Sequence, residues 1–119
     1  MTDYERGEVI LVEIAFSGSP GSKKRPAVVI SNSLFNRAGI KLIVAAVTGN
    51  ICPPFRPGDT LWDDWKAAGL LKPSAVRGIL ATVDQSDIVR RLGQLSPQDR
   101  LKVDQGLASI LNFSVVASP

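Results

Sequence analysis

The sequence predicts a small, mainly β domain of the barrel type that ends in one α-helix. Three observations support this fold class: short apolar segments separated by turn formers, one amphipathic stretch near the C-terminal end, and a length of 119 residues, which fits a single domain. Hydrophobic residues make up 45% of the chain and charged residues 21%, the balance of an ordinary folded globule.

Each predicted strand is a short run of apolar or β-branched residues bounded by turn formers. The first is ended by the turn formers of residues 18–22. The second begins with Pro26, at the position where a strand needs no ladder donor. The third is nearly all apolar, so we expect it to be buried on both faces. The predicted strands are residues 9–16, 26–31, 41–47, 74–83 and 88–92.

One long helix is predicted near the C-terminal end. Ser96 is a natural N-cap, Pro97 suits the first helical turn, and Asp99 follows three residues after the cap. Apolar residues then recur at helical spacing and form one stripe. Shorter helical turns are expected at residues 33–37 and 63–68, and the proline-rich residues 50–58 predict an irregular exposed loop. The apolar stripe consists of Val103, Leu107, Ile110 and Leu111.

Composition excludes several function classes. Histidine is absent, which removes Ser-His-Asp triads, Cys-His dyads, imidazole zinc sites and two-histidine ribonuclease chemistry. The one cysteine, Cys52, cannot form an intrachain disulfide, so we expect a reducing cytoplasm. The longest apolar run is residues 42–47 and the first residues are polar, so we expect neither a membrane span nor a secretory signal.

Positive charge is concentrated in one part of the sequence. Fourteen Lys and Arg against eleven Asp and Glu give a net charge of +3. Between Glu13 and Asp59 there is no carboxylate, and an unopposed run of cations attracts phosphate. A solubilising surface would give the same pattern, so charge alone leaves both interpretations open. The cations of this interval are Lys23, Lys24, Arg25, Arg37, Lys41 and Arg56.

Six segments, in order along the chain, form one set. They are Arg6-Gly-Glu-Val9, Lys24-Arg25-Pro-Ala-Val-Val-Ile-Ser31, Ala45-Ala-Val-Thr48, Gly69-Leu-Leu-Lys-Pro-Ser-Ala-Val-Arg77, Ala81-Thr-Val-Asp84 and Arg91-Leu-Gly-Gln-Leu95. Together they resemble the MazF/PemK family of toxins from bacterial toxin–antitoxin pairs, over nearly the whole chain. Each segment alone is weak evidence, whereas the ordered set at family-like spacing is specific.

This resemblance implies an SH3-like barrel of the CcdB/MazF type that forms a homodimer. It also implies a metal-independent endoribonuclease with no cofactor, which cuts single-stranded RNA and is held inactive by a cognate antitoxin. In that family the catalytic pair is an arginine before the first Pro-Ala-Val-type strand and a threonine that closes the next apolar strand. These positions correspond here to Arg25 and Thr48.

Metal-free RNA cleavage suits these residue types. The 2′-hydroxyl attacks phosphorus, so the enzyme must accept one proton, donate another and stabilise the phosphorane. A guanidinium grips two phosphate oxygens but is a poor base, because its pKa lies above about 12. We therefore assign Arg25 to phosphate stabilisation and leave the base open, while the Thr48 hydroxyl can donate to a phosphoryl oxygen. Without the family pattern, Arg25 would be an extended residue before a proline and Thr48 a turn former.

Arg77 is a candidate for a second phosphate contact, with ordinary solvent exposure as the alternative. In the PemK branch the resemblance implies an aspartate two residues after this arginine, but Ile79 stands there. Many relatives also carry a glutamate in the first loop, whereas residues 17–24 contain no acid. The sequence therefore leaves the carboxylate-assisted mechanism without its acid.

Other segments carry weaker signals. Phe55 and Arg56, in a loop stiffened by prolines, could stack on an unpaired base and hold its phosphate, or Phe55 could simply cap the barrel. Lys23 and Lys24 are further expected RNA contacts beside Arg25. The carboxylates of residues 59–64 lack the spacing of a metal site, so we expect a solvated turn and no metal.

The sequence as a whole predicts a dimeric, cytoplasmic endoribonuclease toxin that acts on single-stranded RNA, binds a cognate antitoxin in a cationic groove and contacts no membrane. Two alternatives stay open. The first is a non-catalytic module of the same fold that binds nucleic acid or a protein target such as a gyrase. The second is a metal-dependent nuclease, which the missing histidine and the scattered carboxylates disfavour.

Overall fold

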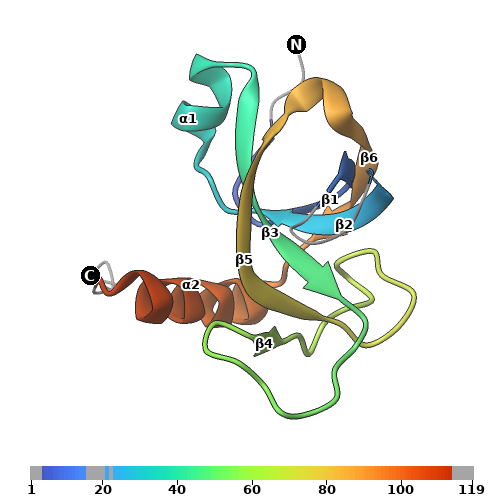
Figure 1. Cartoon of the computed structure of the whole chain (residues 1–119), viewed down its shortest axis with the longest axis vertical. Helices are drawn as coiled ribbons and strands as arrows, with labels where there is room; N and C mark the ends of the chain where they lie inside the picture. Colours follow the sequence, from blue (N-terminus) through green and yellow to red (C-terminus); the bar gives the residue numbers. More distant parts are fainter. Residues whose placement is uncertain (1–3, 16–20, 22, 114–119) are drawn as a thin grey trace.

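The computed structural model describes residues 4–15, 21 and 23–113. They form one antiparallel sheet with a long C-terminal helix packed beside it (Figure 1). The order of strands across the sheet is β4-β5-β3-β2-β1-β6. The elements are β1 (Glu8–Ile14), β2 (Lys23–Val29), α1 (Ser33–Ala38), β3 (Lys41–Thr48), β4 (Thr60–Leu61), β5 (Ala75–Asp84), the 3₁₀ turn η1 (Gln85–Asp87), β6 (Ile88–Gln94) and α2 (Pro97–Leu111).

The sheet curls as a barrel does, but hydrogen bonds do not close it within the described residues. Its two edges are β4 and β6, and no ladder joins them in that part of the chain. Instead, the segment between β4 and β5 lies against β6 through two glycines. A β carbon on Gly69 would lie 1.9 Å from the Leu92 carbonyl oxygen, and one on Gly93 would lie 2.5 Å from the Ala68 carbonyl carbon. The prediction of a mainly β fold with a terminal helix is confirmed, and irregular chain covers the gap between the edges.

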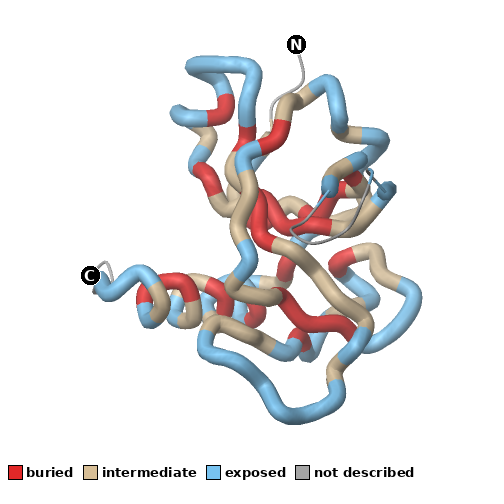
Figure 2. Tube along the Cα trace, viewed as in Figure 1, coloured by how far each residue is buried: buried red, intermediate tan, exposed pale blue. Residues whose placement is uncertain are grey.

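Neighbouring residues on each strand enter two different cores because side chains alternate across a sheet. The first core joins the sheet to α2 and to the segment after β4 (Figure 2). The second is built by the strands that curl together and has no described member in α2. The buried members of the first are Val9, Val28, Ala45, Trp62, Ala68, Val76, Leu95, Val103 and Leu107. Those of the second are Ile10, Val12, Ala27, Val29, Leu42, Val44 and Val83.

The terminal helix is capped as the sequence predicts. The Ser96 side chain accepts a hydrogen bond from the Asp99 backbone N–H at 3.2 Å, and Pro97 occupies the first turn. Within the described residues, no helix has the length and apolar character that a membrane crossing requires.

The second strand begins earlier than predicted, at Lys23 instead of Pro26. Pairing with β1 extends it, since Glu13 lies opposite Lys24 and Val12 lies opposite Arg25. The first strand ends at Ile14; the last residue predicted for it and the turn formers at 18–20 and 22 lie outside the described residues.

The helix predicted at residues 63–68 is wrong, because this segment forms turns. It contains one helical bond, from the Ala68 N–H to the Asp64 carbonyl, before Gly69 turns the chain with φ +83°. The two-residue strand β4 was not predicted, because so short a segment has no periodicity to detect.

Candidate functional site

The register of β2 and β3, continued beyond its last recorded pair, assigns Arg25 and Thr48 to the same face of the sheet. The recorded pairs run from Val29↔Val44 to Ala27↔Ala46. Continuing this register by two residues sets Arg25 opposite Thr48, and the step of two keeps both on the face of Ala27 and Ala46. The two strand ends that carry them therefore lie at one end of the sheet.

Both side chains keep hydrogen-bonding capacity. The Thr48 hydroxyl oxygen accepts from the Asn50 backbone N–H at 3.1 Å, so its own proton stays free to donate to a ligand. Arg25 is half-buried, and within the described residues its guanidinium has no ion pair or hydrogen bond. A planar, unpaired guanidinium and a hydroxyl with a free proton are both suited to bind a phosphate group.

Arg77 lies on the neighbouring strand and has a carboxylate partner that the sequence did not reveal. Its Nη1 is 3.3 Å from Asp59 Oδ2, and the two side chains are 25% and 6% exposed. Asp59 was expected in a solvated turn, so that expectation is wrong for this residue. The sequence does not reveal this ion pair, because Asp59 precedes Arg77 by 18 residues and meets it only through the pairing of β4 with β5.

The remaining predicted contacts spread over a wider surface. Lys23 and Lys24 are exposed on β2, and Phe55 and Arg56 are exposed in the loop between β3 and β4. That loop is tied down where the Arg56 backbone N–H donates to Asp59 at 2.9 Å. No hydrogen bond or ion pair within the described residues joins Phe55 or Arg56 to Arg25.

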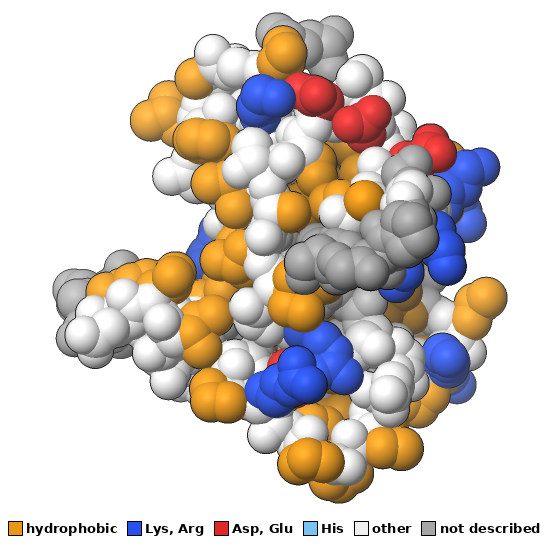
Figure 3. Space-filling model, viewed as in Figure 1, with side chains coloured by type: hydrophobic (Ala, Val, Ile, Leu, Met, Phe, Trp, Pro, Cys, Tyr) orange, Lys and Arg blue, Asp and Glu red, His pale blue; other side chains and the backbone are white. Residues whose placement is uncertain are grey.

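The run of cations in the sequence does not make one surface. Lys41 pairs with Asp84 at 2.7 Å, at the other end of the ladder between β3 and β5, and the Arg37 side chain bonds back to the Ser33 carbonyl within α1. On the face shown in Figure 3, basic side chains gather at the lower centre and right, while most visible acidic ones lie near the top.

A pocket of about 440 Å³ adjoins the ends of β2 and β3, and its lining includes two cations that the sequence did not identify as site residues. Lys72 and Arg90 line it, and the structure gives neither an acidic partner within the described residues. Lys72 belongs to one of the segments that resemble the MazF/PemK family, but only the fold shows that its side chain lies over Gly49. The apolar lining consists of Leu11, Pro26, Val47, Leu70, Leu71 and Leu92. A larger hollow, about 550 Å³ at the start of α2, contains none of the predicted site residues.

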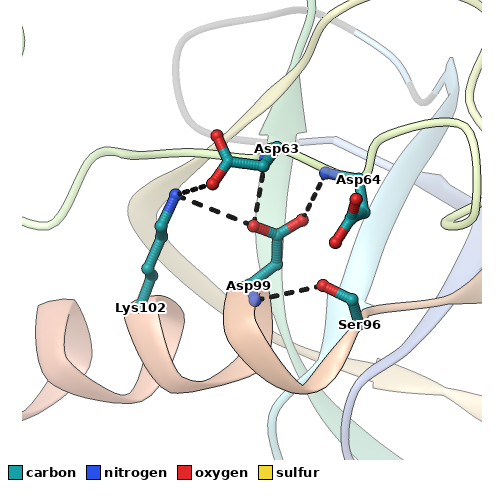
Figure 4. A network of polar contacts seen from close by, with 5 residues as sticks. All are labelled: Asp63, Asp64, Ser96, Asp99 and Lys102. Carbon is teal, nitrogen blue, oxygen red and sulfur yellow. Dashed lines mark hydrogen bonds and ion pairs between the residues drawn. The ribbon is translucent and has the colours of Figure 1, made fainter.

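The acidic residues after β4 serve the fold (Figure 4). Asp99 of α2 is fully buried, and its two oxygens accept from the backbone N–H groups of Asp63 and Asp64 at 3.0 and 2.8 Å. Lys102 reaches Asp63 at 2.7 Å, and this hydrogen bond raises the pKa of the Lys102 ammonium from its usual 10.5. No group of three or more potential metal-ligating acidic or cysteine side chains occurs within the described residues.

Comparison with known proteins agrees with this fold. Residues 5–111 match the family described as PemK-like, MazF-like toxin of type II toxin–antitoxin systems. "Endoribonuclease MazF6" of Mycobacterium tuberculosis is 29% identical over 99 residues, which cover 82% of this chain and 86% of that protein. A solved mycobacterial endoribonuclease has a TM-score of 0.75 at 18% identity, covering 98% of both chains. A mycobacterial endoribonuclease solved in complex with its cognate antitoxin also scores 0.75, at 17% identity, covering 95% of this chain and 99% of the other. The expected MazF-type fold is confirmed.

Proposed function

Since the chain belongs to the PemK-like, MazF-like toxin family of type II toxin–antitoxin systems, we propose that this endoribonuclease cleaves single-stranded RNA without a metal ion. The RNA 2′-hydroxyl attacks the adjacent phosphorus and loses its proton. The bond from phosphorus to the 5′-oxygen breaks, and that oxygen takes up a proton. The products are a 2′,3′-cyclic phosphate and a 5′-hydroxyl.

The observation that supports this proposal is the β2–β3 register, which would set Arg25 and Thr48 on one face when it is continued two residues past its last recorded pair. The Arg25 guanidinium binds two oxygens of the phosphorane, and the Thr48 hydroxyl donates to a third position on the reacting phosphate. Both residues lie on strands that pack into the second core, and a packed sheet suits the positioning of catalytic side chains. The proton acceptor is left unassigned.

The surrounding cations bind the RNA backbone. Lys23 and Lys24 extend the positive surface along β2, and Arg77 provides a second phosphate contact. Phe55 stacks on an unpaired base beside Arg56, in line with recognition of single strands.

The antitoxin is expected to block this surface. One structural relative was solved in complex with its cognate antitoxin. In the present protein, an acidic antitoxin segment lying across the same cationic surface would exclude RNA by charge and by volume. A homodimer would place two such surfaces around one groove, and we propose that the protein works as this dimer in the cytoplasm.

The test is cleavage of a mixed-sequence single-stranded RNA in EDTA, with mapping of the fragment ends. Wild-type protein is expected to leave cyclic phosphate ends, and Arg25→Ala and Thr48→Val to reduce kcat by about a hundredfold or more, the scale seen when a donor to a reacting oxyanion is removed. Lys41→Ala, in the ion pair at the far end of β3, is the matched control and should cleave normally. Intact RNA with a salt-sensitive gel shift would instead identify a non-catalytic binder.

A further inference from the structure

The strand that carries Arg77 is distorted at this residue. Along the ladder between β3 and β5, the pair Val47↔Val76 is followed by Ala45↔Leu80. One residue of β3, Ala46, therefore faces three residues of β5, which is a β-bulge. Bulges change the direction in which a side chain points, and this one begins at Arg77.

The backbone of the loop before β4 packs closely against this bulge at two glycines. A β carbon on Gly58 would lie 3.1 Å from Gly78 Cα, and one on Gly78 would lie 3.3 Å from the Pro57 carbonyl oxygen. Gly58 also has φ +91°, a conformation that favours glycine. This close approach brings Asp59, the next residue, beside Arg77.

Asp59 connects the loop and the bulge through a single oxygen. Its Oδ2 accepts from the Arg56 backbone N–H at 2.9 Å and from Arg77 Nη1 at 3.3 Å. The Asp59 side chain is only 6% exposed, so its charge is shielded from water and depends on these two donors. Arg77 is 25% exposed, and within the described residues only this one of its N–H groups has a partner. The rest of the guanidinium is available to a ligand.

We propose that Asp59 is a positioning residue for RNA cleavage: it holds the Arg77 guanidinium so that its free N–H groups meet a phosphate of the substrate. This inference rests on the proposed function. No carboxylate stands two residues after Arg77 on its own strand, because Ile79 occupies that position. Asp59 supplies that carboxylate from a different segment of the chain.

The geometry explains why Arg77 would act together with the proposed catalytic pair. Thr48 is the strand partner of Ala75, two residues before Arg77 on β5. Residues that are two apart on a strand point to the same face. Arg77, where the bulge begins, is therefore on the same face as Ala75 and its strand partner Thr48. Ala75, two residues before Arg77, and Ala46, which faces the bulge from β3, both carry small side chains.

The experiment is a double-mutant cycle on kcat and KM for single-stranded RNA. Asp59→Asn keeps an oxygen for the Arg56 N–H but removes the charge that holds Arg77. We expect kcat to fall about tenfold to a hundredfold with little change in KM, since misplacement of a group by about 1 Å can cost that much. Arg77→Gln should cause a similar fall, and Asp59→Asn should add nothing in the Arg77→Gln background.

Asp84→Asn is the matched control, because Asp84 also pairs with a cation across the β3–β5 region but at the far end. It should leave kcat unchanged. If Asp59→Asn does not fold, Arg77→Lys is the substitute variant, because it keeps the charge but removes the two parallel N–H donors of the guanidinium. It should lower kcat as Arg77→Gln does. A thermal melt of each variant separates loss of fold from loss of rate.

Normal kcat in folded Asp59→Asn would overturn the inference, as would full additivity of the two substitutions. Failure of the proposed function has a different signature. In that case wild-type protein would leave the RNA intact, or Arg25→Ala would cleave it normally, whatever Asp59 does.

Discussion

The side chain of Lys72 crosses directly over Gly49. A β carbon built on Gly49 would lie 2.0 Å from Lys72 Cε and 2.7 Å from its Nζ. Gly49 directly follows Thr48 in the chain, so the Lys72 ammonium lies over the backbone next to a residue to which we assign catalysis. This cation comes from the segment after β4 and joins the site only in the folded chain.

Removal of Lys72 should weaken RNA binding without regard to base sequence. A phosphate-contacting cation contributes about 0.7 to the salt slope of single-strand affinity, so Lys72→Ala should reduce the slope of log K against log salt by about that amount. The measurement is titration of single-stranded RNA at several salt concentrations, in an Arg25→Ala background that prevents cleavage. Lys41→Ala, which removes an ion-paired lysine far from Thr48, should leave the slope unchanged. An unaltered slope in Lys72→Ala would contradict the assignment.

A methyl group on Gly49 should displace Lys72. The clash involves the end of a flexible side chain, so Gly49→Ala is expected to leave the melting temperature nearly unchanged. RNA affinity should fall as in Lys72→Ala, and Gly49→Ala should have no effect once Lys72 is already alanine. Additive losses in the double variant would show that Gly49 acts on RNA by another route.

Asp99 should contribute strongly to stability. Asp99→Ala leaves the backbone N–H groups of Asp63 and Asp64 without their acceptor, at about 1–3 kcal/mol for each group that stays buried. Because both groups are partly buried, we expect the free energy of unfolding in urea to fall by about 2–4 kcal/mol. Asp99→Asn, which keeps one oxygen, should cost less. Gln105 is exposed on the same helix, so Gln105→Ala should change the free energy of unfolding by no more than about 0.5 kcal/mol.

The Lys102–Asp63 ion pair should give stability a dependence on alkaline pH. The hydrogen bond to Asp63 raises the pKa of Lys102 in the folded state above the usual 10.5. The contribution is therefore complete below pH 10.5 and is lost as pH rises through the folded-state pKa. Unfolding curves of wild type and Lys102→Gln should differ slightly near pH 9 and converge at more alkaline pH. High salt should shrink the difference at pH 9, because both groups contact solvent.

Local patterns were enough for most elements of the fold. Ser96 and Pro97 begin α2, and the apolar strand from Lys41 to Val47 is β3 almost as predicted. The start of β2 was missed because the residues before Pro26 are extended by pairing with β1, a contact with no local signature. The segment at 63–68 was misassigned because Gly69, at φ +83°, turns the chain after a single helical bond, from the Ala68 N–H to the Asp64 carbonyl.

The fold class and the family could be read from the amino-acid sequence, and so could the candidates Arg25 and Thr48, because strand periodicity, helix caps and ordered motifs each lie in consecutive residues. Which charges meet depends on the folded chain. In the folded chain Asp59 pairs with Arg77, the Lys72 side chain lies over Gly49, and Lys41 pairs with Asp84 at the far end of β3. These contacts link residues that are far apart in the chain. They depend on strand register and on a bulge, neither of which can be predicted from short-range sequence patterns.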